Sequence, residues 1–531
     1  MANIPNIPVW RDIGCSPIPL AQEERAEILI VGGGPVGLTL ALDLGRRGRK
    51  VTLINQLDFI SAGSKAICFA KRTLDIWSRL GVADRMIDKG VIWNVGKVFC
   101  GDSNDPLYQF DMQPVKGQKN PGFINLQQYH AEEILFEALQ QYDNVDIRLG
   151  HAATALEQHD TGARVEVETA EGNYTVDAQW VIACDGNKSP IREMLGLDFE
   201  GRVFEDNFLI ADVKFTEERP SERWFWFDPA FNRGQSALLH KQPDNVWRLD
   251  FQLGWDIDRE ACTKPENVEP FVRGMLGGDV EFDEEWYSVY TFQCRRMRHF
   301  VHDRVIFAGD SAHLVSPFGA RGCNGGVADA DNLGWKLDVV LSNPASLPLI
   351  DSYNEEATLT ADENILNSTR STDFMTPKSN MSIAFRDAVL ELAADFAFAR
   401  PFVNSGRLST AVGYPESILN TKDRDEWHGG VAPGYPAIDA AIAETWLLDQ
   451  LGGEFVLITN DLDIAVDGLK QIDLPGSGDA GSAASRYSMP PGSAYLVRPD
   501  QYVAARWLNP TKNDVVDALT RAKGLADNGQ A

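Results

Sequence analysis

Three glycines near the start of the chain have the spacing of a phosphate-binding turn. They lie in the segment GGGPVG, residues 32–37, directly after an apolar run. Gly32, Gly34 and Gly37 give the pattern G-x-G-x-x-G, in which glycine permits a tight turn, close approach of a pyrophosphate and close packing of the next helix. Pro35 lies within the same turn, and a helix is predicted to follow it to about Gly48. The segment therefore predicts a dinucleotide site.

Two later segments each place an aspartate beside a glycine at the end of an apolar run. The first is Asp185-Gly186 and the second is Gly309-Asp310. An ionised carboxylate only accepts hydrogen bonds, so Asp310 could bind the hydroxyl groups of a sugar-like chain. Alternatively, Asp310 caps an ordinary junction between a strand and a helix, and Asp185 caps the short helix that follows it.

A loop rich in glycine and proline follows the second aspartate and leads into a long helix. The loop runs from Pro317 to Asn324, and the helix is predicted to begin near Asn324 and to reach about Leu337. The amides of Gly322, Cys323 and Asn324 would lie at the helix N-terminus, where the helix dipole favours an anion. The loop therefore predicts a second surface that binds a polyoxygenated anion.

These turns must be positioned by the strands and helices of an α/β fold. Short apolar runs around a helical pattern predict a βαβ unit over residues 26–56, and further strands at 180–183 and 305–308. Asn55 ends the second strand of this unit, where the motif usually has an acidic residue. Its amide can bind a ribose hydroxyl without charge assistance.

The three motifs, in this order and at these separations, resemble those of the group A flavoprotein aromatic hydroxylases, especially the phenol-type and 3-(3-hydroxyphenyl)propionate-type enzymes. The resemblance covers about residues 26–345 well and the remainder more loosely. It implies an α/β fold: a Rossmann-like FAD-binding domain with an inserted β-sheet substrate domain and a C-terminal thioredoxin-like domain. Thiol redox chemistry is excluded in the last domain, because no cysteine follows Cys323.

The resemblance and the changes in composition along the chain predict five segments. The prediction is an N-terminal arm at 1–24, an FAD-binding domain in two parts at 25–199 and 293–409, a substrate-binding sheet at 200–292 and the thioredoxin-like domain at 410–531. The second part of the FAD-binding domain also contains additional helices. Whether the arm packs on its own subunit or on a neighbour stays open.

The resemblance implies FAD as the cofactor and adds two residues to its site. Lys65 stands where the family has an arginine that contacts the phosphates, and a solvated lysine is the alternative. Gln128 matches the glutamine that binds the ribityl chain. The cofactor-binding residues are therefore predicted to be Gly32, Gly34, Pro35, Gly37, Asn55, Lys65, Gln128, Asp185, Gly309, Asp310, Pro317, Gly322, Cys323 and Asn324.

The region after residue 200 has the alternating pattern of a β-sheet with many aromatic side chains. One face could form an apolar pocket over the flavin, and Trp226, His240 and Arg248 are predicted to bind the substrate there. Arg223 and Tyr290 are further polar candidates. The alternative is that most of the aromatic residues form the core of the sheet.

The resemblance implies a single-component monooxygenase. NADPH or NADH reduces FAD, O2 adds at the flavin C4a position, and the hydroperoxide hydroxylates a phenolic or other activated aromatic compound. Arg321 is the predicted catalytic residue, because its charge could bind a substrate carboxylate or the anionic reduced flavin. An outward arginine paired with an acid is the alternative. A Baeyer-Villiger or epoxidising oxygenase on the same scaffold and a non-catalytic FAD-binding protein are the alternative functions.

The composition excludes several other partners. The 531 residues carry a formal net charge of −28, which argues against nucleic acid and anionic membranes. The seven scattered cysteines contain no C-x-x-C pair, so we expect reduced thiols in the cytoplasm and no metal site. No apolar run reaches the roughly 18 residues of a spanning helix. The expected partners are a small aromatic substrate and O2, and the additional C-terminal domain makes a homodimer plausible.

Overall fold

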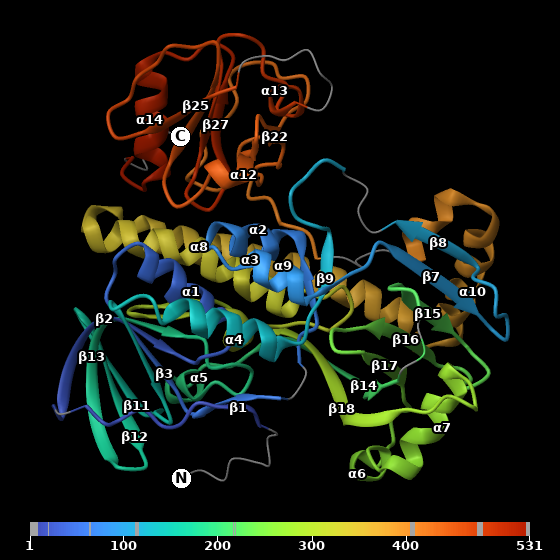
Figure 1. The fold of residues 1–531 in the computed structure, drawn as a ribbon. Helices are drawn as coiled ribbons and strands as arrows, with labels where there is room; N and C mark the ends of the chain where they lie inside the picture. Colours follow the sequence, from blue (N-terminus) through green and yellow to red (C-terminus); the bar gives the residue numbers. More distant parts are fainter. Residues whose placement is uncertain are drawn as a thin grey trace.

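The computed structural model describes residues 9–19, 21–62, 65–111, 116–215, 217, 219–403, 409–474 and 482–526. Figure 1 shows an α/β body, a second sheet beside it, and a C-terminal domain above the helices of the first body. Within the described ranges, no helix combines the length and the apolar character needed to cross a membrane.

The first sheet has eight strands with a parallel centre. Its order is β10-β3-β2-β13-β12-β11, with β20 also paired to β13 and β19 paired to β20. Strands β10, β3, β2, β13 and β20 are parallel, and the remaining pairs are antiparallel. The strands are β2 (Glu23–Val31), β3 (Val51–Asn55), β10 (Val145–Leu149), β11 (Ala152–His159), β12 (Gly162–Thr169), β13 (Gly172–Ala183), β19 (Val301–His302) and β20 (Val305–Phe307).

The three motif turns lie at one edge of this sheet, because they follow three adjacent parallel strands. Val31 of β2 is paired with Ala183 of β13, and Ala183 is paired with Phe307 of β20. The ends of these strands are continuous apolar runs, as expected for parallel strands covered on both faces. Open α/β sheets bind their ligands at the carboxyl ends of the strands. The fold therefore brings the three turns together.

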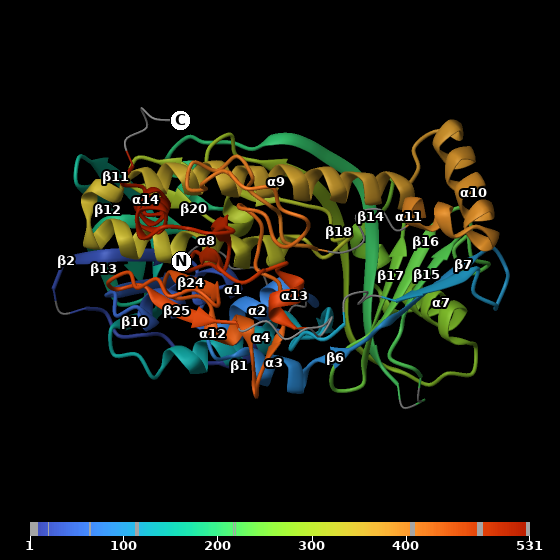
Figure 2. The same ribbon diagram turned by 90° about the horizontal axis from the view of Figure 1, so that it is seen from above.

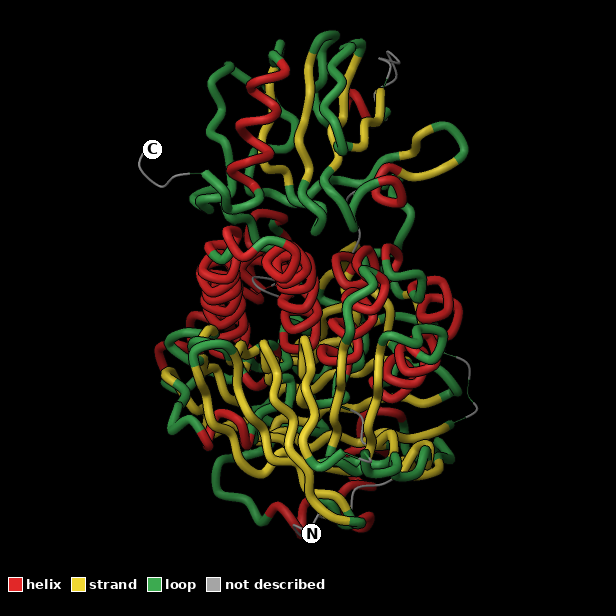
Figure 3. The backbone as a smooth tube through the Cα atoms, turned by 90° about the vertical axis from the view of Figure 1, so that its left-hand side faces the viewer, coloured by secondary structure: helices red, strands yellow, loops and turns green. Residues whose placement is uncertain are grey.

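A layer of helices lies between this sheet and the C-terminal domain (Figure 3). Helix α1 follows the first glycine turn and packs against α8, which follows the third turn. Helix α8 in turn packs against α2 and α9. The helices of this body are α1 (Pro35–Arg46), α2 (Lys71–Arg79), α3 (Ala83–Lys89), α4 (Gln128–Leu139), α5 (Pro190–Met194) and α8 (Gly322–Ser342).

The substrate sheet has eight strands in the order β21-β18-β14-β17-β16-β15-β7-β8. The predicted limits 200–292 are too narrow, because β7 and β8 come from an earlier part of the chain and β18 and β21 extend beyond residue 292. Helices α6 (Arg259–Cys262) and α7 (Pro265–Leu276) also belong to this body. The strands are β7 (Val95–Cys100), β8 (Tyr108–Asp111), β14 (Glu200–Lys214), β15 (Arg223–Phe227), β16 (Ser236–Lys241), β17 (Val246–Gln252), β18 (Asp283–Arg296) and β21 (His313–Leu314).

One long helix joins the two bodies. Figure 2 shows α9 (Pro348–Met375) running from the first body to the substrate sheet, and it contacts α8, β18 and β19. Helices α10 (Asn380–Asp395) and α11 (Arg400–Val403) follow it. Because α9 is continuous, it fixes the position of the substrate sheet relative to the first body.

The C-terminal domain contains a mixed sheet in the order β25-β24-β26-β27. Strands β24 and β25 are parallel, whereas β26 is antiparallel to both β24 and β27. That this domain is thioredoxin-like stays a prediction. Its elements are β22 (Ala441–Ile442), β23 (Thr445–Trp446), α12 (Leu447–Gln450), β24 (Val456–Asn460), β25 (Lys470–Asp473), α13 (Ala483–Arg486), β26 (Ser493–Val497), β27 (Val503–Trp507) and α14 (Lys512–Ala522).

The described part of the N-terminal arm packs on its own chain. Strand β1 (Val9–Asp12) pairs with β4 (Phe59–Ser61), and Arg11 Nη1 donates to Glu133 at 2.9 Å and to Glu137 at 2.8 Å. The first eight residues lie outside the described ranges.

A separate small sheet contains β5 (Cys68–Ala70), β6 (Val91–Ile92) and β9 (Phe123–Asn125).

Candidate functional site

The first glycine turn is open at the start of α1. Gly32 has φ +114°, and a Cβ atom there would lie 2.3 Å from the carbonyl oxygen of Cys184. A Cβ atom on Gly37 would lie 2.0 Å from the carbonyl oxygen of Gly32. Gly34 precedes Pro35, the first residue of α1, and has no atom within 4 Å of its Cβ position. The turn packs tightly on the second motif and leaves space where a phosphate would meet the helix N-terminus.

Asn55 holds the shape of this turn. Its Oδ1 accepts a hydrogen bond from the N–H of Gly33 at 3.0 Å, and its Nδ2 donates to the carbonyl oxygen of Leu57 at 3.0 Å. The predicted bond between Asn55 and a ribose hydroxyl stays a prediction, and it would have to use the remaining capacity of the amide.

The two oxygens of Asp185 have different environments. Oδ2 accepts a hydrogen bond from the N–H of Ile191 at 3.2 Å, although the N-cap of α5 is Ser189 and not Asp185 as the alternative predicted. Oδ1 is buried and has no hydrogen-bond partner in the described part of the chain. Burial raises the pKa of Asp185 to about 6. A buried oxygen without a partner at this sheet edge is suited to accept a hydrogen bond from a ligand.

A buried aspartate of α8 holds the third turn. Asp329 Oδ2 accepts a hydrogen bond from the N–H of Gly309 at 3.0 Å and lies 2.6 Å from Nε2 of His313. Burial lowers the pKa of His313, but the charge and hydrogen bond of Asp329 outweigh this and raise it. Sequence reasoning missed both residues. The available signal was an aspartate within an otherwise apolar helix segment, which needs a partner when it is buried.

Asp310 lies beside the start of α8. Its side chain is accessible to solvent, and burial among the surrounding groups raises its pKa. A Cβ atom on Gly322 would lie 4.0 Å from Asp310 Oδ1. The carboxylate and the N-terminus of α8 therefore border the same space.

The loop before α8 has a constrained backbone. Gly319 has φ +89° and Ala320 has φ +53°, a left-handed conformation that is unfavourable for alanine. The carbonyl oxygen of Pro317 accepts a hydrogen bond from the N–H of Ala320 at 3.0 Å. Helix α8 begins at Gly322, earlier than the predicted start near Asn324. The turn thus fixes the position of the helix N-terminus next to Asp310.

The side chain of Asn324 ties the start of α8 to β5 and α2. Its Oδ1 accepts hydrogen bonds from the N–H of Ala70 at 2.8 Å and from Oγ1 of Thr73 at 2.6 Å. Its Nδ2 donates to the carbonyl oxygen of Cys68 at 2.9 Å. A contact between Asn324 and a cofactor is therefore left to its backbone amide. Burial raises the pKa of the neighbouring Cys323, so its thiol stays neutral.

Gln128 and Lys65 surround a glutamate that sequence reasoning missed. Gln128 Oε1 accepts a hydrogen bond from the N–H of Ala66 at 3.0 Å, and its Nε2 donates to Glu132 at 2.7 Å. Burial raises the pKa of Glu132 to about 7, although Gln128 and the charge of Lys65 oppose this. Lys65 is exposed, and its charge also lowers the pKa of Asp310. The lysine therefore lies near both carboxylates.

Arg321 is buried and contacts α9. It is 4% exposed, and its Nη1 donates to Asn364 Oδ1 at 3.1 Å. Burial lowers the pKa of Arg321 to about 10, and the charge of Glu363 opposes this shift. The alternative of an outward, surface-paired arginine is wrong. Its catalytic role stays a prediction.

The two faces of the substrate sheet have different neighbours, because successive side chains of a strand alternate. Trp226 packs with the core under α7 and stacks on Phe99, with 5.1 Å between ring centroids. The prediction that Trp226 binds the substrate is wrong, because its side chain lies on the α7 face. On the other face, Phe318 of the loop before α8 contacts Phe208 and Phe292, with centroids 5.3 and 5.4 Å apart. We call this the loop-facing side.

His240 and Arg248 lie on the loop-facing side, in one cross-strand row with Arg223 and Asp212. Arg248 Nε and Nη2 each donate to one oxygen of Asp212 at 2.8 Å. His240 Nε2 lies 3.0 Å from Asp250 Oδ2, and burial lowers the pKa of His240 to about 4, so the ring is neutral. That these two residues bind the substrate stays a prediction, and Arg248 already has a carboxylate partner.

Tyr290 connects the loop-facing side to the third motif. It is 47% exposed, and burial together with the charge of Asp310 raises its pKa to about 12. A neutral phenol hydroxyl therefore lies near Asp310.

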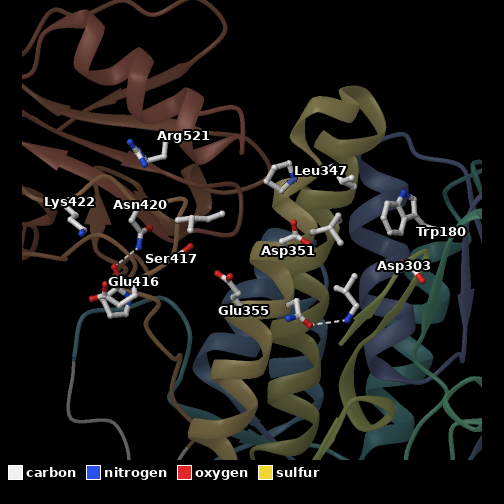
Figure 4. Close-up of a pocket in the computed structure, with 16 residues that line it drawn as sticks. Trp180, Asp303, Leu347, Asp351, Glu355, Glu416, Ser417, Asn420, Lys422 and Arg521 are labelled. Carbon is white, nitrogen blue, oxygen red and sulfur yellow. Dashed lines mark hydrogen bonds between the residues drawn. The ribbon is translucent and has the colours of Figure 1, made fainter. Parts of the chain in front are cut away.

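A separate groove of about 980 Å³ lies between α9 and the C-terminal domain (Figure 4). Its lining includes Trp180, Asp351, Glu355, Asn420 and Arg521. None of its lining residues belongs to the three motif turns, so we do not assign the cofactor to this groove.

Among the residues that the structure covers, no group of three or more His, Cys, Asp or Glu side chains could hold a metal ion.

Comparisons with known proteins identify the class of this site. The profile of the family described as FAD binding domain matches residues 25–368. A 3-(3-hydroxyphenyl)propionate/3-hydroxycinnamic acid hydroxylase of Mycolicibacterium gilvum (strain PYR-GCK) is 27% identical over 95% of this chain and 93% of that protein. The hydroxylase of the same name from Escherichia coli O81 (strain ED1a) is 24% identical over 96% of this chain and 97% of that protein.

Solved structures share the fold. The flavin-dependent monooxygenase PieE, in complex with FAD and substrate, has a TM-score of 0.80 and 22% identity, covering 95% of this chain and 100% of that chain. The p-nitrophenol 4-monooxygenase PnpA from Pseudomonas putida DLL-E4 has a TM-score of 0.64 and 26% identity, covering 72% and 97%.

The chain belongs to the FAD binding domain family. The resemblance to flavoprotein aromatic hydroxylases, the Rossmann-like FAD-binding fold with its substrate sheet, and FAD as the cofactor are thereby confirmed. The residues present also fit FAD, because Gly34 leaves space at the start of α1, Asp185 has a buried oxygen without a partner among the described residues, and Asp310 has an exposed carboxylate beside α8.

Proposed function

We propose that this chain is a single-component flavoprotein monooxygenase that hydroxylates a phenolic or other activated aromatic compound with NAD(P)H and O2. The observation that carries this proposal is the meeting of the three motif turns at one sheet edge, with the aromatic loop-facing side of the substrate sheet against the loop before α8. A bound cofactor would then lie next to the apolar side chains that contact the substrate.

The cofactor contacts are proposed from the same geometry. The amides at the start of α1 would bind the pyrophosphate, and Asp310 would accept hydrogen bonds from hydroxyl groups. The amides at the start of α8 would stabilise negative charge on the reduced flavin ring. The full set of proposed FAD contacts is Gly32, Gly34, Pro35, Gly37, Asn55, Lys65, Gln128, Asp185, Gly309, Asp310, Pro317, Gly322, Cys323 and Asn324.

The protein and the cofactor would divide the work of the reaction. FAD, once reduced by NADPH or NADH, supplies the activation of O2, which no side chain provides. The chain has to hold the aromatic ring in place and exclude water. Phe208, Phe292 and Phe318 form an apolar wall suited to this task. Arg321 would add positive charge beside the loop before α8.

The substrate is proposed as a class. The relatives are named for 3-(3-hydroxyphenyl)propionate and 3-hydroxycinnamic acid, each of which combines a phenol with a carboxylate. We propose a hydroxylated aromatic acid, with 3-(3-hydroxyphenyl)propionate as the first compound to test.

Oxidation of NADH and NADPH by the purified FAD-containing protein tests this function. The rate is measured with a panel of phenols and hydroxylated aromatic acids, and the products are analysed by mass spectrometry. The proposal expects one class of aromatic compound to stimulate both NAD(P)H oxidation and O2 consumption and to gain a ring hydroxyl. A lactone or epoxide product would instead identify the Baeyer-Villiger or epoxidising alternative. A protein that no compound stimulates would point to non-catalytic FAD binding.

A cytoplasmic location and a homodimer are proposed as well. All seven cysteines are free thiols, as expected in a reducing compartment. Exposed apolar side chains gather on α10 and the turns after it, where Met381, Phe385, Phe398 and Phe402 are each more than half exposed. Such a patch is typical of an interaction surface. Light scattering of the purified protein would measure the mass in solution.

A further inference from the structure

Arg223 is a buried guanidinium that lacks a partner of matching strength. It begins β15 on the loop-facing side and is 7% exposed. Its Nη1 donates to the thiol sulfur of Cys68 at 3.5 Å, a weak acceptor. Its Nε is buried and has no hydrogen-bond partner in the described ranges. Burying a charge without a strong partner is costly, so this site favours an additional acceptor.

Several other buried arginines of this chain have carboxylate partners. Arg248, two strands away in the same row, makes two hydrogen bonds to Asp212. Arg498 is bonded to Glu356 in the same bidentate way. For Arg223, no carboxylate of the described residues lies within ion-pair distance, 4.0 Å.

Asp250 carries an opposing charge on the same side of the sheet, but His240 already contacts it at 3.0 Å. His240 and Arg248 do most to lower the pKa of Asp250 against the effect of burial, and the charge of Arg223 adds a smaller contribution, so Arg223 and Asp250 interact through space. This interaction offsets part of the cost of burying Arg223 but satisfies none of its N–H groups. The unfilled N–H positions therefore call for an anion that reaches the guanidinium itself.

Two aromatic rings lie beside the guanidinium of Arg223. Its Cζ lies 5.5 Å from the ring centroid of Trp93 and 5.3 Å from that of Phe225. Both distances are within the range of cation–π contacts. Such contacts use none of the N–H donors, so these donors can still bind a planar, bidentate acceptor.

The position of Arg223 links it to the cofactor side of the protein. Its partner Cys68 also accepts, through its carbonyl oxygen, the hydrogen bond from Asn324 at the start of α8. Trp93 shares an apolar cluster with Cys68 and with Ala320 of the loop before α8. Cys68 therefore connects Arg223 to Asn324, at the end of the loop that we assign to the flavin.

We infer that Arg223 binds the carboxylate of an aromatic acid substrate, through the buried guanidinium edge between Trp93 and Phe225. This inference rests on the proposed function and names the residue that binds the acid group of the proposed substrate. Asp250 lies on the next cross-strand row, so a carboxylate bound to Arg223 has to stay away from Asp250 to avoid repulsion.

Binding to the oxidised FAD-containing protein tests the inference without any turnover. The probes are benzoate, 3-hydroxybenzoate and 3-(3-hydroxyphenyl)propionate, each compared with its primary amide, and the readouts are the flavin absorbance change and calorimetry. We expect at least one acid to bind the wild-type protein more tightly than its amide. Arg223→Met should lower the affinity for that acid by about 100-fold, because a charge-assisted pair is lost. The affinity for the amide should fall by less than about 3-fold.

A matched variant and a conservative variant complete the experiment. Arg233→Met removes an exposed arginine after β15 that pairs with Asp102, and it should bind every probe as the wild type does. If Arg223→Met does not retain FAD, Arg223→Lys is measured instead, with a loss of about 10-fold expected for the acid alone. Equal affinity of the wild type for every acid and its amide, or equal losses for both in the variants, would overturn the inference. Failure of the proposed function would appear separately, as acid binding without stimulated NAD(P)H oxidation.

Discussion

At the scale of single residues, the environment of each carboxylate indicates whether it stabilises the fold or is available to bind a ligand. Asp329 and Asp212 are buried and each accepts strong hydrogen bonds from protein groups. Asp310 has an exposed side chain, and Asp185 keeps one buried oxygen without a partner in the described chain. Because burial penalises a charge that lacks partners, the second pair is suited to donors of a bound cofactor.

Arg321 gives the first prediction at this scale. Replacement by alanine removes a buried positive charge beside the loop before α8, so we expect kcat for every accepted substrate to fall by roughly 10- to 100-fold, while FAD stays bound. Rapid-reaction measurements of flavin reduction and product formation check this. Arg298→Ala, at an exposed position, is the control. Unchanged reduction and turnover in Arg321→Ala would remove Arg321 from the mechanism.

Glu132 gives a prediction about pH. Its folded-state pKa is about 7, raised from 4.5 by burial. The folded protein thus prefers the protonated form, and the stability that this contributes is fully present below about pH 4.5 and is lost as pH rises through 7. Between pH 5 and 8, the free energy of unfolding of the FAD-free protein should fall more for wild type than for Glu132→Gln. Denaturant titrations at several pH values measure it, with Glu355→Gln as an exposed control. Parallel curves for wild type and Glu132→Gln would contradict the assignment.

At the scale of elements, the site depends on how closely α1 and α8 approach each other. Gly326 of α8 allows this approach, because a Cβ atom there would lie 2.5 Å from Val36 Cγ2 and 3.0 Å from the Cα of Gly309. Val36 belongs to the first motif turn and Gly309 to the third. The contact between two helices therefore sets the spacing of the turns that we assign to FAD.

Substitution of Gly326 by valine should disturb this spacing. Overpacking of this kind costs about 1–3 kcal/mol, and the displaced turns should also bind FAD more weakly. Thermal unfolding and the fraction of FAD retained after gel filtration are the measurements. Gly254→Val serves as the control, since no atom lies within 4 Å of its Cβ position. Wild-type stability and full FAD content in Gly326→Val would show that the helices can separate freely.

At the scale of the whole molecule, a buried ionic network attaches the C-terminal domain to the helices of the FAD-binding body. Arg498 is fully buried and donates to both oxygens of Glu356 on α9, at 2.7 and 3.0 Å. Lys336 of α8 donates to the same carboxylate at 2.8 Å. These charges strongly lower the pKa of Glu356, so it stays ionised. The domain is thus held by contacts that water does not screen.

Removal of Arg498 should therefore destabilise the protein strongly. Arg498→Met leaves Glu356 without its main partner, and breaking such a buried pair costs about 3–5 kcal/mol. Arg424→Met breaks an exposed pair with Asp514 in the same domain, which should cost no more than about 1 kcal/mol. Equilibrium unfolding compares the two. Similar small losses for both variants would show that the network adds little stability.

Sequence patterns predicted the parts of this molecule that depend on local order. The three turns were found because each combines a strand, a glycine and a helix start within one short stretch of the chain. The predicted face for the side chain of Trp226 was wrong. Alternation of residues shows that a strand has two faces, but it does not show which face meets the loop before α8. The roles of Asn324 and Glu356 were missed, because their partners are distant in sequence, at Cys68 and Arg498.

The most direct test of the central claim is the origin of the oxygen atom in the product. The FAD-containing protein is supplied with NADH or NADPH, the aromatic acid that stimulates oxidation, and ¹⁸O₂ in ordinary water. A flavin-dependent aromatic hydroxylase predicts one ¹⁸O atom in a new ring hydroxyl, with formation of product matching the NAD(P)H consumed. An unlabelled product, or consumption of NAD(P)H that yields only hydrogen peroxide with every aromatic compound, would contradict the account.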